Sequence, residues 1–295
     1  MSTDKNCLAV IGGDDREVVL VKSLTDRGYS IKVFGLSASL MPLSVQVCSS
    51  FQEAVENVDV VILPLPGINN KGILYAKLFP HDICLTPEDF AYISPNVPVF
   101  VGAASQYLKN IAQTKRISLI EVGDLDEVAI PNSVPSAEGA IQIAMEKLPI
   151  TIHGSESFVI GYGRVAETLC TMLKGIGAKV TVFARNSSQL AKCQVLGYQA
   201  KELKYLSQYV NQADVIFNSV PALVIDEEVL IKTRKDTLII DLASIPGGTN
   251  FEAAKKLGVS ALLAPGLPGK VAPLTAGKIL AEAYPRIIDS YYQRT

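Results

Sequence analysis

The sequence lacks tryptophan altogether and has only two histidines, His81 and His153, among its 295 residues. Neither histidine lies late in the chain, which argues against a dehydrogenase that depends on a catalytic histidine there. The five cysteines form no Cys-x-x-Cys pair, so neither a disulfide framework nor a zinc site is predicted. We expect free, buried thiols and no metal site.

Long apolar runs and dense basic stretches are also missing. No segment is long and apolar enough to predict a membrane span, and the net charge of −2 argues against nucleic acid as a partner. The first six residues contain no apolar signal-peptide segment. These absences predict a cytoplasmic protein.

What is present is a regular alternation of short apolar strands with helix-like segments. Hydrophobic residues make up 48% of the chain, enough for two domains with sizeable cores. The alternation predicts two doubly wound, Rossmann-like parallel-sheet α/β domains separated by a cleft. The expected strands are 7–12, 30–34, 58–63, 83–85, 97–101, 158–160, 179–183, 214–218, 237–241 and 261–263.

The most informative motif lies near the middle of the chain. An apolar strand runs into Gly161-Tyr-Gly163-Arg-Val-Ala166, which is followed by an amphipathic segment. This G-x-G-x-x-A pattern between strand and helix is typical of a turn that holds a dinucleotide pyrophosphate against a helix N-terminus. The first turn of the chain, from Gly12, lacks the third small residue. It predicts a nucleotide fold that no longer holds a nucleotide, or a sheet that presents another ligand.

The end of the next strand indicates which dinucleotide binds. Sites for NAD place an acidic residue there, whereas no carboxylate occurs between Lys179 and Lys201. The arginine at 185 and the serines that follow suit a 2′-phosphate, so we expect NADP rather than NAD. The predicted cofactor-binding residues are Gly161, Gly163, Arg164, Val165, Arg185, Ser187, Pro221, Ser244 and Pro268.

The predicted domains are residues 1–132 with 275–295, for the substrate, and 133–274, for NADP. Ser133 is expected to cap a helix that begins with Pro135 and crosses between the domains. The last helix, about 275–292, is expected to pack on the N-terminal domain.

The loops that follow the strands supply the candidates for substrate binding and catalysis. Arg16 can pair with a substrate carboxylate, or it is a surface arginine beside a helix cap. Asn132 and Ser133 suit a carboxylate at a helix start, although capping alone also explains them. Ser244 lies in a loop expected beside the nicotinamide.

Several longer runs resemble the A subunits of dipicolinate synthase from spore-forming bacteria, and the resemblance covers essentially the whole chain. These runs are 10–14 with Arg16, 132–139, 151–155, 241–249, 261–269, 271–273 and 275–277.

The resemblance implies an oxidoreductase that makes dipicolinate in the mother cell during sporulation, by NADP-linked dehydrogenation of a dihydrodipicolinate-type dicarboxylate. It also implies a protein partner, the flavoprotein-like B subunit. A homo-oligomer is possible as well.

Two other interpretations remain open. The chain can be a non-catalytic NADP-binding scaffold for a flavoprotein partner, because no acid–base pair is evident. The run 268–275 also resembles methylenetetrahydrofolate dehydrogenases, but these need a Tyr-x-x-x-Lys pair. Tyr75 and Tyr107 are instead each followed by a lysine two positions on, with a single residue between.

Overall fold

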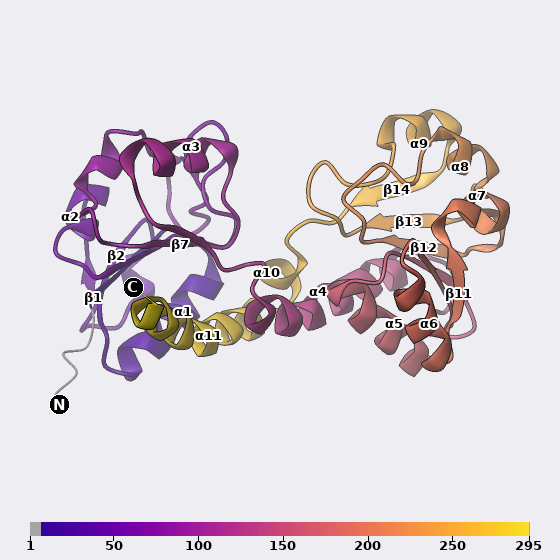
Figure 1. The fold of residues 1–295 in the computed structure, drawn as a ribbon, viewed down its shortest axis with the longest axis horizontal. Coiled ribbons are helices and arrows are strands. Elements are labelled where there is room, and N and C mark those ends of the chain that lie inside the picture. The colour runs from indigo at the N-terminus through magenta and orange to yellow at the C-terminus, as the bar shows by residue number, and fades with distance from the viewer. Residues whose placement is uncertain (1–6, 295) are drawn as a thin grey trace. The chain divides into compact units, whose positions relative to one another are not determined.

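The computed structural model describes residues 7–294, and contacts divide the chain into two compact units. Unit 1 comprises Met1–Pro131 with Ala272–Thr295, and unit 2 comprises Asn132–Val271. Each contains a six-stranded parallel sheet with helices on both faces (Figure 1). The predicted pair of Rossmann-like α/β domains is therefore confirmed. The predicted domain boundaries and the cleft stay predictions, and the segment 1–6, where no signal peptide was expected, lies outside the described residues.

Unit 1 pairs its strands in the order β3-β2-β1-β4-β7-β8. These strands are β1 (Cys7–Ile11), β2 (Ser30–Phe34), β3 (Gln46–Val47), β4 (Val60–Ile62), β7 (Val99–Val101) and β8 (Leu119–Glu121). Its helices are α1 (Asp15–Asp26), α2 (Phe51–Val55), α3 (Gln106–Lys115) and α11 (Pro273–Arg294), with short 3₁₀ turns at Ala38–Leu40 and Asp89–Tyr92.

The central strand β1 shows why this sheet is covered on both sides. Leu8 and Val10 belong to one apolar cluster, and Ala9 and Ile11 belong to another. Because successive side chains of a strand point to opposite faces, both faces of the sheet are buried. The last helix α11 contributes the fully buried Tyr284 to the first cluster, as the sequence predicted.

One predicted strand of this domain has a different partner. The segment 83–85 was expected in the main sheet, but β6 (Ile83–Cys84) pairs antiparallel with β5 (Ile73–Leu74) in a separate two-stranded sheet. A run of three apolar residues carries too little pattern to specify its neighbour. The prediction for this segment was wrong.

Unit 2 pairs its strands in the order β11-β10-β9-β12-β13-β14, the same order as unit 1. They are β9 (Glu156–Ile160), β10 (Lys179–Ala184), β11 (Gln199–Glu202), β12 (Val215–Asn218), β13 (Leu238–Asp241) and β14 (Ser260–Leu263). The helices are α5 (Arg164–Ile176), α6 (Ser187–Val195), α7 (Leu206–Tyr209), α8 (Glu227–Lys232), α9 (Phe251–Leu257) and α10 (Leu267–Val271), with 3₁₀ turns at Leu203–Tyr205 and Val210–Gln212.

The long helix α4 (Asp126–Lys147) begins nine residues earlier than the sequence predicted. It runs through Pro131 and Pro135, so Ser133 lies inside the helix and does not cap it. Each proline removes one backbone hydrogen bond. Burial of Val128, Ala137 and other residues along α4 offsets that loss. The expectation of a helix start at Asn132 and Ser133 was therefore wrong.

No helix within residues 7–294 is both long and apolar enough to span a bilayer.

The packing of α11 on α1 depends on Gly277. A Cβ at this position would lie 2.7 Å from Val19 Cβ and 2.8 Å from the carbonyl oxygen of Arg16. Gly277→Ala should therefore lower the free energy of unfolding by about 1–3 kcal/mol, the usual cost of overpacking.

Gly175, in α5, is the matched control because a Cβ there meets no atom within 4 Å. Gly175→Ala should raise stability by roughly 0.5–1 kcal/mol through helix propensity. Urea unfolding measures the free energy of unfolding of both variants. An equal change in the two would contradict the packing argument.

Candidate functional site

The turn between β9 and α5 has the geometry that its glycines predicted. Gly161 has a φ of +89°, and a Cβ there would lie 2.5 Å from Ser219 Oγ. Its N–H donates to the carbonyl of Phe183 at 2.8 Å, which ties the turn to the end of β10. Only glycine combines a positive φ with the absence of a Cβ, and this position requires both.

Gly163 is the N-cap of α5 and supplies no side-chain cap. A Cβ at Gly163 would meet nothing within 4 Å, so the space in front of the helix N-terminus is open. Uncapped N–H groups and the positive end of the helix dipole attract an anion. Ala166, fully buried, is the small residue that the motif needs where the helix meets the sheet.

A cavity of about 280 Å³ lies beside this turn. Four predicted cofactor residues line it, namely Gly161, Gly163, Arg185 and Pro221. Sequence reasoning missed Tyr162, Phe183, Ala184, Asn186, Gln189, Leu203, Ser219 and Val220. Gln189 has a clear role, because its side-chain amide donates to the carbonyl oxygen of Tyr162 at 3.0 Å and so holds the glycine turn against α6.

A second cavity, of about 360 Å³, adjoins the first and shares Arg185 and Leu203 with it. Its other lining residues are Lys204, Leu206, Ser207, Leu223, Val224, Asp226, Glu228 and Val229. Leu223 is 63% exposed, which is unusual for a large apolar side chain. The first cavity contains the glycine turn, and the second contains apolar side chains such as Leu223. The cation Arg185 lies where the two cavities meet.

Arg185 is exposed at the end of β10 and makes no hydrogen bond or ion pair with any residue in 7–294. Lys204, by contrast, pairs with Glu202 at 2.7 Å. Ser187 begins α6, where the side chain of Asn186 caps the helix. Ser187 lines neither cavity, so the guanidinium of Arg185 is the stronger candidate for an anion.

The other predicted cofactor residues lie outside the two cavities. Arg164 and Val165 are the first residues of α5, Ser244 is exposed in the loop after β13, and Pro268 lies in α10. Their roles toward a cofactor stay predictions.

The loop that carries Ser244 is held by Asp241, which is completely buried. One carboxylate oxygen accepts hydrogen bonds from Asn218 Nδ2 at 3.0 Å and from the N–H of Ala243 at 3.1 Å. The other oxygen accepts from the N–H of Gly248 at 2.8 Å and from Thr249 Oγ1 at 2.7 Å. These four donors satisfy a buried charge and link the ends of β12 and β13.

The corresponding turn of unit 1 is covered by its own chain. The N–H of Gly13 donates to the carbonyl of Tyr75 at 2.8 Å, and the N–H of Lys77 donates to the carbonyl of Gly13 at 2.9 Å. A Cβ at Gly12 would lie 2.8 Å from the same Tyr75 oxygen. The segment 74–77 therefore lies directly against the turn after β1.

Arg16 is only 5% exposed and is paired with Asp14. Its Nε and Nη2 donate to the two oxygens of Asp14 at 2.8 and 3.0 Å, and Tyr75 Oη donates to Asp14 at 3.0 Å. Burial alone would raise the pKa of Asp14, but the hydrogen bonds and charge of Arg16 hold that pKa below its usual value. Arg16 is thus a buried, paired cation, while its role toward a substrate stays a prediction.

Glu17 completes this cluster from the first turn of α1. Its carboxylate accepts the N–H of Asp14 at 2.8 Å and forms a capping box with it. Burial raises the pKa of Glu17 to about 7, against the attraction of Arg16.

Asn132 and Ser133 lie within α4 rather than at a helix start. Ser133 Oγ is 2.6 Å from Thr168 Oγ1 of α5, and Ser136 Oγ donates to the carbonyl of Asn132 at 2.8 Å. Asn132 Oδ1 is buried and has no hydrogen-bond partner among the described residues. A buried amide oxygen without a donor is costly, and the roles of Asn132 and Ser133 toward a substrate stay predictions.

Comparison with known proteins gives two family matches, one in each unit. Residues 7–123 match the N-terminal domain of the A subunit of dipicolinate synthase, and residues 142–253 match the shikimate / quinate 5-dehydrogenase family.

Individual relatives extend this likeness over the whole chain. The dipicolinate synthase A subunit of Bacillus subtilis (strain 168) is 34% identical over 282 residues, which cover 95% of each protein. The crystal structure of the dipicolinate synthase A subunit from Bacillus halodurans superposes with a TM-score of 0.90 at 34% identity, covering 96% of this chain and 97% of that one. A transhydrogenase from Sinorhizobium meliloti, at 12% identity and a TM-score of 0.69 over 96% and 94% of the chains, shares the fold alone.

The protonation of Glu17 generates a prediction about pH. Its pKa is higher in the folded protein (about 7) than its usual value of 4.5, so folding favours the protonated carboxyl. The stability that this group contributes is complete below about pH 4.5 and is lost as the pH rises through about 7. Glu17→Gln keeps the capping box and removes this titration.

Urea unfolding at about pH 5 and about pH 8 measures the effect. The wild type should lose up to a few kcal/mol relative to Glu17→Gln over this interval, since one pKa unit corresponds to about 1.4 kcal/mol. Identical pH profiles of the two proteins would refute the raised pKa.

Proposed function

Since the chain belongs to the family of dipicolinate synthase A subunits, we propose that it is an NADP-dependent oxidoreductase that forms dipicolinate from a dihydrodipicolinate-type dicarboxylate. The observation that carries the proposal is the open space before the N-terminus of α5 at Gly163. An open helix N-terminus beside two adjoining cavities fits a dinucleotide pyrophosphate.

Several residues would hold the cofactor. The turn 161–163 and the first N–H groups of α5, at Arg164 and Val165, would bind the pyrophosphate. The apolar pocket around Leu203 and Leu223 would take the adenine. When bound, a nicotinamide cofactor supplies the acceptor for a hydride.

The dehydrogenation removes one hydride and one proton from the dihydropyridine ring and leaves an aromatic ring, and the proton would pass to water or to a side chain beside the substrate. Such a strongly downhill step needs orientation more than acid–base power. The chain's own contribution would be to hold the two carboxylates of the substrate. The candidates are Arg16, Asn132, Ser133 and Ser244.

The setting that we propose is the cytoplasm of the mother cell during sporulation, where the chain would work with a flavoprotein-like B subunit. The name of the Bacillus subtilis relative, which designates one subunit of a synthase, supports the expectation of a partner.

The first test is turnover of freshly generated dihydrodipicolinate with NADP, with and without the B subunit, followed by the absorbance of dipicolinate and NADPH. The variant that tests the proposed cofactor site is Gly163→Asp. Its Cβ fits the open space, and aspartate is a good N-cap, so the variant should fold at least as stably as the wild type.

The carboxylate of Gly163→Asp would occupy and repel the phosphate position. We expect dinucleotide affinity and turnover to fall by about tenfold or more, because the anion site would carry a like charge. Binding of NADP by the wild type without turnover in either mixture would favour a scaffold. Unchanged binding by Gly163→Asp would remove the proposed cofactor site.

The preference for NADP over NAD is tested by binding of 2′,5′-ADP against 5′-AMP, which differ only in the 2′-phosphate. We expect the wild type to bind 2′,5′-ADP more tightly and Arg185→Gln to lose about tenfold or more of that preference, since a charge-assisted hydrogen bond contributes about 1.5–3 kcal/mol. Lys256→Gln is the control, because Lys256 is exposed on α9 outside both cavities.

Equal affinity of the wild type for the two nucleotides would overturn the NADP assignment. A wild-type preference that survives Arg185→Gln would instead assign 2′-phosphate recognition to another residue, with Lys204 the next cation that lines the cavity.

A further inference from the structure

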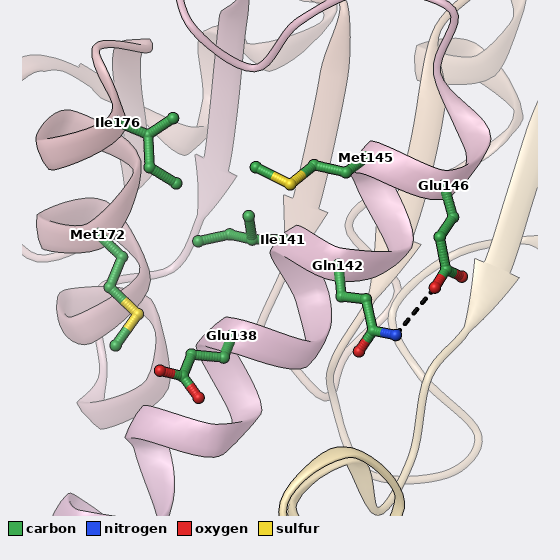
Figure 2. Close-up of a pocket in the computed structure, with 7 residues that line it drawn as sticks. All are labelled: Glu138, Ile141, Gln142, Met145, Glu146, Met172 and Ile176. Atoms are coloured by element: carbon green, nitrogen blue, oxygen red, sulfur yellow. Dashed lines mark hydrogen bonds between the residues drawn. The ribbon is translucent and has the colours of Figure 1, made fainter.

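A groove on unit 2 has no part in the proposed reaction. It lies between α4 and α5 and encloses about 550 Å³. Figure 2 shows Ile141 and Met145 of α4 pointing toward Met172 and Ile176 of α5 across this groove. Met145 is 53% exposed, so its apolar side chain faces solvent in this unit.

The apolar surface continues along α4 beyond the groove. Val134 is 39% exposed and precedes Ile141 by seven residues, which places both on the same side of the helix. Two of the four methionines of the chain line the groove. Methionine is flexible and adapts to a partner's side chains, so a groove lined by methionines suits protein recognition.

The polar residues of the groove carry one sign of charge. Glu138 points toward Met172 at the edge of the groove, while Gln142 and Glu146 point away from α5 and are joined by a hydrogen bond of 2.8 Å (Figure 2). Within residues 7–294, no lysine or arginine pairs with Glu138. A partner that covers the groove must therefore supply positive charge.

This pattern disfavours a second copy of the chain as the occupant. Glu138 and Glu146 lie four residues on either side of Gln142. An antiparallel copy centred on Gln142 would bring the Glu138 of one molecule against the Glu146 of the other. Like charges brought together at an interface oppose association. The few polar groups also do not converge as they do in a small-molecule site.

We infer that this groove, formed by Ile141, Met145, Met172 and Ile176 with Glu138 at its edge, docks a basic amphipathic helix of a partner protein. Apolar side chains spaced three and four residues apart would fill the groove, and flanking lysines or arginines would meet the glutamates. This surface is separate from the residues that line the two nucleotide cavities.

Three fluorescein-labelled helical peptides of about 14 residues, or about four turns, test the inference by anisotropy. The first combines a leucine face with lysines, the second replaces the lysines by glutamates, and the third replaces the leucines by serines. We expect the first to bind the full chain about tenfold or more tightly than either of the others, because both apolar burial and charge are needed.

Met145→Gln and Glu138→Gln should each weaken binding of the leucine–lysine peptide severalfold. Val195→Gln is the matched control, since Val195 is 87% exposed on α6 and lies outside the groove. All three positions are exposed, so the variants should keep the melting temperature of the wild type.

Three results would overturn the inference. The first is equal binding of the lysine–serine peptide, which would show attraction by charge alone. The second is failure of all three peptides to bind. The third is a dimer of the chain in sedimentation velocity that Met145→Gln dissociates, since the occupant would then be a second copy.

Discussion

Each sheet is organised by the turn in which its first strand ends. Gly12 donates its N–H to the carbonyl of Phe34 at 2.7 Å, and Gly161 donates its N–H to the carbonyl of Phe183 at 2.8 Å. Both glycines have positive φ, so the chain leaves the strand in a direction that an L-residue rarely takes. The same bond thus joins the ends of the first and second strands in both units and starts the following helix at the carboxyl edge of the sheet.

The two turns diverge at the N-cap that follows. In unit 2 the cap is Gly163, which has no side chain and leaves the helix N-terminus open. In unit 1 the cap is Asp14, whose carboxylate already bonds the helix N–H groups and is itself neutralised by Arg16. An anionic side chain thus stands in unit 1 where an anionic ligand would bind. The N-cap residue therefore distinguishes the two helix N-termini, one bonded by a carboxylate and the other open.

The sequence predicted best those parts of the structure that depend on a particular residue type at a particular spacing. The glycine turn at 161–163 and the cation at 185 could be predicted, because spacing along the chain determines both. The rest of the cavity beside this turn could not be predicted, since Gln189 and Leu203 reach it only through folding. The sequence did not predict strands β3, β8 and β11, because they are short edge strands without a clear apolar pattern. The predicted start of α4 was too late because the prolines suggested a helix boundary, whereas burial of other residues of the helix outweighs the local cost of each proline.

Buried polar groups of unit 2 differ in whether the protein itself satisfies them. Asp241 is satisfied by four donors of the protein itself, so the loop from Ala243 to Thr249 keeps its anchors without any ligand. Ser244 lies exposed between those anchors, and Asn132 Oδ1 is buried without a donor. A carboxylate held by four donors gains nothing from a ligand, whereas an unbonded amide oxygen does. The protein thus satisfies Asp241 with its own donors, whereas Asn132 Oδ1 is an acceptor that no described residue uses.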